Sequence, residues 1–192
     1  MEKYIRSYIN NIKQTIDNIN TDEIIAVADI LLETYKSDRR IFVMGNGGSA
    51  STASHMACDL AKGTSCEGKK RFSVISLNDN TAHFTAIAND ISYEDIFSEQ
   101  LKNILQKGDL VLVISASGNS PNLIKAMKYA RLKGAKTAAL LGFSGGECKE
   151  LADVYAHIKK NDYGIVEDIH LMIEHMITKY FKDKIKSLDI EE

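Results

Sequence analysis

The amino-acid sequence predicts an α/β protein built on a doubly wound, five-stranded parallel sheet flanked by helices. The first observation is a set of short apolar runs, rich in β-branched and aliphatic residues, in which apolar and polar positions hardly alternate. This pattern is typical of strands that are buried on both faces. The second observation is that helical patterns separate the runs, and such an alternation favours a parallel sheet. The expected strands occupy residues 41–44, 72–77, 110–114, 137–141 and 154–158.

Two helices are expected before the first strand. Apolar residues recur at helical spacing in residues 4–19 and, after a polar break, in residues 24–35. We expect this pair, residues 1–38, to cover its own domain or a second subunit and to serve in oligomerisation. No repeat, low-complexity run or linker interrupts the chain, so we expect one domain, residues 1–192. Its α/β core and C-terminal helix span 39–192, with helices near residues 50–62, 93–105, 119–133 and 165–185.

Composition restricts the class of protein. The 192 residues include 24 Lys and Arg and 26 Asp and Glu, and the formal net charge of −2 argues against a nucleic-acid partner. No apolar stretch approaches the roughly 20 residues that a membrane span needs, and the first residues lack the apolar region of a signal peptide. The three cysteines are an odd number without metal-finger spacing, which argues against a disulfide framework. We therefore expect a cytoplasmic protein without a membrane partner.

The loop after the first expected strand, residues 45–49, reads GNGGS and leads into a helix. Glycines allow a close backbone approach, and the free N–H groups at a helix start favour an anion. Gly45, Gly47 and Ala50 also match the G-x-G-x-x-A dinucleotide pattern, but the second strand does not end on the acidic residue that this pattern needs. We therefore expect no nucleotide. A single phosphate or sugar hydroxyl beside Ser49, or a plain strand-to-helix turn, remains open.

The loop after the third expected strand carries three serines around a glycine at the start of a helix. The hydroxyl groups of Ser115, Ser117 and Ser120, together with the helix N–H groups, suit the oxygens of one phosphate. The alternative is helix capping by Ser120 and a turn at Gly118, but capping needs only one serine. The lysine of a P-loop is absent, which argues against ATP hydrolysis of that kind.

GNGGS after the first strand and SASGNS after the third resemble the SIS (sugar isomerase) family, and more narrowly its phosphoheptose isomerases. The segment at residues 85–90 and the spacing of His170 and His175 extend the resemblance over nearly the whole chain. It implies a homotetramer with active sites at subunit interfaces. It also implies conversion of sedoheptulose 7-phosphate to D-glycero-D-manno-heptose 7-phosphate through an enediol or enediolate, for lipopolysaccharide or capsule, and a Zn²⁺ ion in the site.

The resemblance also assigns residues to the reaction. Asp59 or Glu167 is expected to be the base and His175 the acid, and a metal set is expected from His55, Asp59, Glu167 and His175. Asp59 stands where the family usually has Glu, and Glu167 where it usually has Gln. The shorter Asp59 matters because a displacement of about 1 Å can cost on the order of a hundredfold in rate.

Substrate binding is expected at the two loops and after the second strand. The family has Ser-Thr-Ser where this chain has Ala116 between two serines, and it has Asp-Thr-Ser where this chain has Asn80. These departures leave room for a different substrate in the same reaction class. The expected substrate-binding residues are Asn46, Gly47, Gly48, Ser49, Asp79, Asn80, Ser115, Ser117, Ser120 and Glu167.

The alternative from another class is a non-catalytic protein of the same fold. The family that the sequence resembles also includes phosphosugar-binding regulators and a protein that associates with a replication initiator. The substituted positions keep this alternative open. The retained His55 and His175, with a carboxylate on each of the two helices, favour an isomerase.

Overall fold

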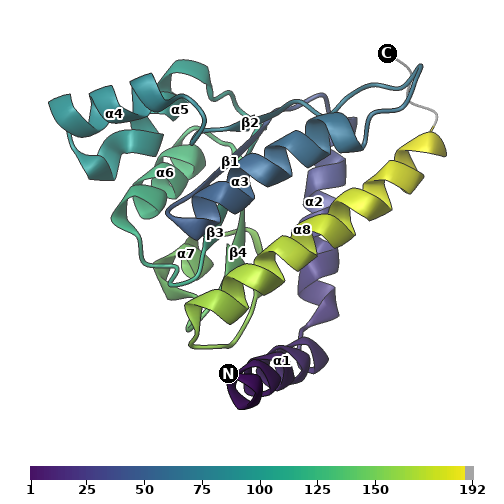
Figure 1. Cartoon of the computed structure of the whole chain (residues 1–192). Coiled ribbons are helices and arrows are strands. Elements are labelled where there is room, and N and C mark those ends of the chain that lie inside the picture. Colours follow the sequence, from purple (N-terminus) through teal and green to yellow (C-terminus); the bar gives the residue numbers. More distant parts are fainter. Residues whose placement is uncertain (189–192) are drawn as a thin grey trace.

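Five parallel strands form the centre of the structure, a computed structural model that describes residues 1–188 and is drawn in Figure 1. Their order in the sheet is β2-β1-β3-β4-β5, so the chain crosses over after β2 and winds outward in both directions. This confirms the expected five-stranded parallel sheet. The strands are β1 (Ile41–Gly45), β2 (Val74–Ser76), β3 (Leu110–Ser115), β4 (Lys136–Leu141) and β5 (Val154–His157).

Helices cover both faces of the sheet. On β1, Ile41 and Val43 pack into one apolar cluster, while Phe42 and Met44 pack into another on the opposite face. Both faces are buried, which is why the strands read as continuous apolar runs. The first cluster is closed by α2 (Thr21–Lys36), α3 (Gly48–Cys58) and α8 (Tyr163–Lys186), and the second by α4 (Thr81–Asp90), α5 (Ile96–Ile104), α6 (Pro121–Leu132) and α7 (Gly146–Leu151).

The structure differs from the expected elements in three places. Strand β2 is shorter than the run at 72–77, and Ile75 is exposed, because β2 is an edge strand that pairs only with β1. Helices α4 and α7 were not expected; α4 buries only Ile87, and α7 is six residues long, so neither has a strong apolar period. The helix expected at 93–105 begins as a 3₁₀ turn, η2 (Tyr93–Asp95).

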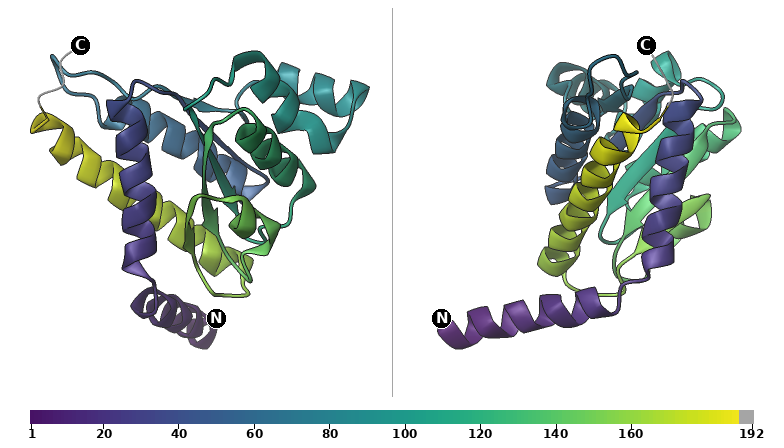
Figure 2. Two further views of the ribbon diagram at one scale, coloured as in Figure 1. Left: turned by 180° about the vertical axis from the view of Figure 1, so that it is seen from behind. Right: turned by 90° about the vertical axis from the view of Figure 1, so that its right-hand side faces the viewer.

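The two N-terminal helices have different surroundings. Helix α2 packs on the sheet of its own chain, where Val27 and Leu31 are fully buried. Helix α1 (Glu2–Asp17) buries no residue and projects from the rest of the molecule (Figure 2). It is held by the Tyr8 hydroxyl, which donates a hydrogen bond of 2.7 Å to Asp168 at the start of α8, and this bond raises the pKa of Tyr8 to about 12.

Helices α3 and α8 lie side by side on one face of the sheet and run in the same direction (Figure 1). Helix α3 continues into a π-helical turn, η1 (Asp59–Gly63), in which the Thr64 N–H donates to the Asp59 carbonyl. Helix α8 is the longest helix, with 24 residues. Even so, no helix within residues 1–188 combines the length and the apolar character needed to cross a bilayer.

Candidate functional site

The carboxyl ends of β1 and β3 meet the starts of α3 and α6 at one cavity, here called the glycine–serine pocket. Gly47 has φ of +56° and lets the chain turn directly into α3. The N-termini of α3 and α6 supply free N–H groups beside the cavity. The pocket measures about 300 Å³ and is lined by Asn46, Gly47, Gly48, Ser49, Ile114, Ser115, Ala116, Ser117, Ser120, Tyr163 and Glu167.

The serine loop has an internal hydrogen-bond framework. The Ser115 hydroxyl accepts from the Gly118 N–H at 3.0 Å, and the Ser117 hydroxyl accepts from the Asn119 N–H at 3.2 Å. Ser120 is the residue before α6, but its side chain makes no capping hydrogen bond. Capping therefore does not account for the hydroxyl group of Ser120. The loop places the hydroxyl-bearing residues Ser115, Ser117 and Ser120 around one cavity at a helix start, and phosphate binding there stays a prediction.

Gly118 is required where it stands. Its φ is +66°, and a Cβ atom there would lie 1.9 Å from the carbonyl oxygen of Gly145. The Cys148 N–H donates to the Gly118 carbonyl at 2.9 Å, which ties the serine loop to α7. Any larger residue would therefore push the loop away from α7 and distort the pocket.

Glu167 lies in the glycine–serine pocket, on the first turns of α8. A Cβ atom on Gly48 would lie 2.3 Å from Glu167 Oε2, so the absence of a side chain at Gly48 lets this carboxylate approach the start of α3. A carboxylate here is placed to accept hydrogen bonds from sugar hydroxyl groups. Glu167 thus lines the same pocket as the serine loop, and its contact with a substrate stays a prediction.

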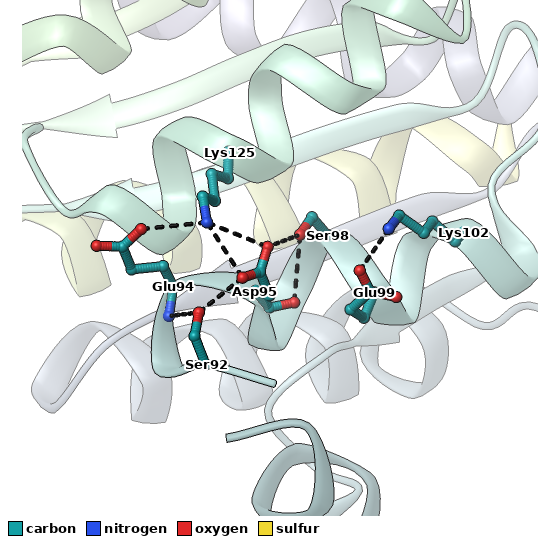
Figure 3. A network of polar contacts seen from close by, with 7 residues as sticks. All are labelled: Ser92, Glu94, Asp95, Ser98, Glu99, Lys102 and Lys125. Carbon is teal, nitrogen blue, oxygen red and sulfur yellow. Dashed lines mark hydrogen bonds and ion pairs between the residues drawn. The ribbon is translucent and has the colours of Figure 1, made fainter. Parts of the chain in front are cut away.

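Asn46 is held by its neighbours. Its side-chain amide exchanges two hydrogen bonds with that of Asn122, at 2.9 and 3.0 Å, and its Oδ1 also accepts from the Tyr93 hydroxyl at 3.1 Å. Tyr93 belongs to η2, which Lys125 of α6 anchors through ion pairs of 3.1 Å to Glu94 and to Asp95 (Figure 3).

Ser92 adds a further bond to Asp95, and these bonds keep the pKa of Asp95 below its usual value (Figure 3). The segment before α5 and helix α6 are thus joined to each other, and Tyr93 links them to Asn46 of the pocket.

Asp79 and Asn80 lie elsewhere. They line a second cavity of about 770 Å³ at the β2 edge of the sheet, together with Ser54 and Cys58. Asp79 accepts a hydrogen bond of 2.5 Å from the Ser54 hydroxyl, and Asn80 accepts from the His83 N–H at the start of α4. Within one chain, neither residue lines the glycine–serine pocket.

Two histidines and two carboxylates meet between α3 and α8, and we call them the histidine–carboxylate cluster. The Nε2 atoms of His55 and His175 are 3.3 Å apart, and His55 Nε2 lies 3.4 Å from Asp59 Oδ2. The fourth member is Glu174, whose Oε2 lies 3.4 Å from His175 Nε2. One potential ligand atom from each residue lies within 4.8 Å of all the others, so the cluster could hold a metal ion.

The sequence analysis did not single out Glu174. Its side chain is fully buried, Oε1 accepts a hydrogen bond of 2.9 Å from the Thr178 hydroxyl, and burial raises its pKa. The available signal was a lone carboxylate on the apolar face that includes Ile173 and Ile177, beside a candidate ligand. Glu167 stands seven residues earlier, on the same face of α8.

The expected metal set is brought together only in part. His55, Asp59 and His175 share the cluster, whereas Glu167 lies at the glycine–serine pocket. The reason is helix geometry: Glu167 and His175 share a face of α8, but eight residues separate them by about 12 Å along the axis. A shared helix face therefore did not imply a shared site.

Comparisons with known proteins agree with this architecture. The family model described as SIS domain matches residues 3–142. A probable phosphoheptose isomerase of Thermoplasma acidophilum is 38% identical over 87% of this chain and 91% of that protein. A phosphoheptose isomerase of Sulfurimonas denitrificans is 36% identical over 96% of this chain and 97% of that protein. The structure of a phosphoheptose isomerase from Neisseria gonorrhoeae superposes with a TM-score of 0.87, at 26% identity over 95% of this chain and 98% of that one.

Proposed function

The chain belongs to the SIS domain family and, within it, to the phosphoheptose isomerases, and we propose that it converts sedoheptulose 7-phosphate to D-glycero-D-manno-heptose 7-phosphate. One observation carries the proposal: α3 and α8 each connect the glycine–serine pocket to the histidine–carboxylate cluster. From Gly48 to His55 the distance along α3 is about 10 Å. An anion site and an acid–base site at that separation suit the two ends of an extended sugar phosphate.

Binding is proposed to begin with the phosphate group. Ser49, Ser115, Ser117 and Ser120 would hold its oxygens together with the N-termini of α3 and α6. Glu167 would accept hydrogen bonds from sugar hydroxyl groups, and the second N–H of the Asn46 amide, which Asn122 does not use, would donate one. Binding energy gained at this remote end would orient the reacting end of the sugar.

Proton transfer is proposed to take place at the cluster. Isomerisation through an enediolate needs one base near C1 and C2 and an acid for the oxygens. We assign the base to Asp59 and the acid to His175, because both lie in the cluster. Glu167 remains the alternative base, since its carboxylate lies in the pocket that would hold the sugar.

The donor set of the cluster fits a divalent metal ion, and Zn²⁺ is the ion we propose. Imidazole nitrogens and carboxylate oxygens are its usual ligands, and bonds of about 2.0–2.1 Å place tetrahedral donors about 3.3–3.4 Å apart. The measured separations are 3.3 Å for His55–His175 and 3.4 Å for His55–Asp59. When bound, such an ion would polarise the carbonyl group or stabilise the enediolate.

We further propose that the chain acts as a single domain in a cytoplasmic homotetramer. Helix α1 supports this proposal, because none of its residues is fully buried in its own chain while Tyr4, Ile5, Ile9 and Ile16 are exposed along it. In such an assembly, Asp79 and Asn80 at the β2 edge would contact a sugar bound by a neighbouring subunit.

The proposal is tested by turnover of sedoheptulose 7-phosphate, with and without added zinc, and with fructose 6-phosphate as the control sugar. We expect turnover of the heptulose phosphate only. Absence of turnover on both sugars, with both phosphates still raising the melting temperature, would instead identify a phosphosugar-binding protein without isomerase activity.

A further inference from the structure

Tyr163 is an aromatic side chain in the glycine–serine pocket to which the proposed function gives no role. It is the first residue of α8, it is 60% exposed, and it lines the pocket together with the residues of the serine loop. Glu167 stands four residues later, so the two side chains lie on one face of α8. This face of the helix therefore forms one wall of the cavity.

The ring of Tyr163 does not stand free in solvent, because Phe143 supports it. The two ring centroids lie 4.7 Å apart with the planes at 71°, which is the edge-to-face arrangement that aromatic pairs favour. Phe143 is itself partly buried against the apolar cluster that α8 closes. One part of the Tyr163 ring is thus fixed by the body of the protein, while the side chain remains open to the pocket.

Phe143 holds this place in a backbone conformation that a non-glycine residue rarely adopts. Its φ is +45°, in the left-handed region, and Asp38 is the only other non-glycine residue with positive φ within residues 1–188. Two hydrogen bonds maintain this conformation: the Phe143 N–H donates to the Lys160 carbonyl at 3.2 Å, and His157 Nε2 donates to the Phe143 carbonyl at 3.0 Å. Glycine would relieve the strain but would leave Tyr163 without its aromatic neighbour.

The loop after β4 also fixes the two aromatic rings relative to the serine loop. The Gly142 N–H donates to the Ser115 carbonyl at 3.2 Å. A Cβ atom on Gly142 would lie 2.7 Å from the Ala116 carbonyl oxygen and 2.5 Å from Val166 Cγ1, so the chain passes between the serine loop and α8 without spare room. Tyr163 is therefore held on the side of the pocket that the serine loop forms.

We propose that Tyr163 is a further substrate-binding residue, whose hydroxyl group donates a hydrogen bond to the phosphate group held by the serine loop, and that Phe143 is its positioning residue. A phenol is a neutral donor, and its hydrogen bond to an anionic oxygen is stronger than one between two neutral groups. The ring also excludes water from one side of the anion, which strengthens the other hydrogen bonds. This inference rests on the proposed function, because it specifies how the phosphate group of the substrate is bound.

The decisive experiment measures the affinity of the full chain for inorganic phosphate by isothermal titration calorimetry. Tyr163→Phe keeps the ring and removes only the hydroxyl group. Tyr180→Phe is the matched control, because Tyr180 is 52% exposed on the same helix and lies about 26 Å farther along it. We expect Tyr163→Phe to weaken phosphate binding about tenfold to a hundredfold, the range for a hydrogen bond to a charged group, and Tyr180→Phe to leave it unchanged.

Two further readouts separate binding from a structural role. Without phosphate, Tyr163→Phe should melt at the same temperature as the unmodified chain, because the side chain that loses its hydroxyl group is exposed. In turnover of sedoheptulose 7-phosphate, KM should rise by a similar factor while kcat changes little, because the phosphate group is remote from the reacting carbons.

A double-mutant cycle tests the role of Phe143. Phe143→Leu should weaken phosphate binding in the unmodified chain and have no further effect in Tyr163→Ala, because it acts through the ring that this variant lacks. Equal losses in the two backgrounds would show that Phe143 supports the fold and does not position Tyr163.

Unchanged phosphate affinity in Tyr163→Phe would overturn the inference, and so would an equal loss in Tyr180→Phe. Turnover by the unmodified chain keeps this outcome separate from the proposed function. If the unmodified chain isomerises the sugar while Tyr163→Phe binds phosphate normally, only the assignment of Tyr163 fails. If Tyr163→Phe loses phosphate affinity while the unmodified chain has no turnover on any sugar phosphate, the assignment of Tyr163 stands and the isomerase proposal fails.

Discussion

The Nε2 atoms of His55 and His175 lie 3.3 Å apart, although 120 residues separate the two histidines in the chain. Each belongs to a helix that starts at the glycine–serine pocket, and the two helices run in parallel from there. The pair therefore marks the point where the chain brings the proposed acid–base centre to a fixed distance from the proposed anion site. Substitutions at the two centres should affect different steps of the reaction.

Loss of the cluster side chains should affect chemistry more than binding. We expect His175→Ala and Asp59→Ala each to lower kcat by about a hundredfold to ten-thousandfold, because each removes a group proposed to transfer a proton. Phosphate binding should persist, since the serine loop is untouched. Steady-state kinetics on sedoheptulose 7-phosphate measures both effects, with the exposed Glu150→Ala as control. Full activity in both cluster variants would show that the catalytic residues lie elsewhere.

The strands of the sheet could be predicted, because burial on both faces shows directly in the residues of each strand. Runs such as 41–44 bury alternate residues on opposite faces, and each side needs apolar residues. The positions of the loops at residues 45–49 and 115–120 could be predicted, because glycine and serine clusters after a buried strand are typical of a turn into a helix. The edge position of β2 could not be predicted from residues 72–77, because it depends on which strands pair in the whole sheet.

The candidate site could be predicted less completely. His55 and Asp59 are one helical turn apart, so their proximity follows from the sequence. Glu174 could not be found in this way, because its role depends on how α8 packs against α3. The misplacement of Glu167 has the same origin: helix periodicity gives the angle around α8, but only the packing decides which turn meets His55.

Gly118 should be intolerant of substitution for two separable reasons. Gly118→Ala places a Cβ atom 1.9 Å from a backbone oxygen at φ of +66°, whereas Gly68→Ala meets only open space at φ of +69°. The matched control should lose about 1 kcal/mol of unfolding free energy from backbone strain alone. Gly118→Ala should lose on the order of 3 kcal/mol and also its stabilisation by phosphate. Equal losses in urea unfolding would mean that the loop moves freely away from α7.

The exposed face of α1 should control assembly. A double substitution of Ile5→Glu and Ile9→Glu introduces two charges on one face, and we expect the proposed tetramer to dissociate into smaller species. Asn10→Glu, about 140° around the helix from Ile5, is the control and should leave the assembly intact. Sedimentation velocity measures the result. A tetramer that survives the double substitution would exclude α1 from the subunit contacts.

His170 should make the fold sensitive to acid. Its side chain is fully buried, and burial lowers its pKa from 6.5 to about 4, with nearby His157 contributing. As pH falls below 6.5, the unfolded chain takes up the proton first, so stability from neutral His170 is present above pH 6.5 and is lost progressively toward pH 4. The difference corresponds to roughly 3 kcal/mol. Chemical unfolding between pH 7 and pH 4 measures this effect. The free energy of unfolding should fall less steeply with pH in His170→Leu than in the unmodified chain. Identical slopes for the two proteins would mean that other groups cause the acid sensitivity.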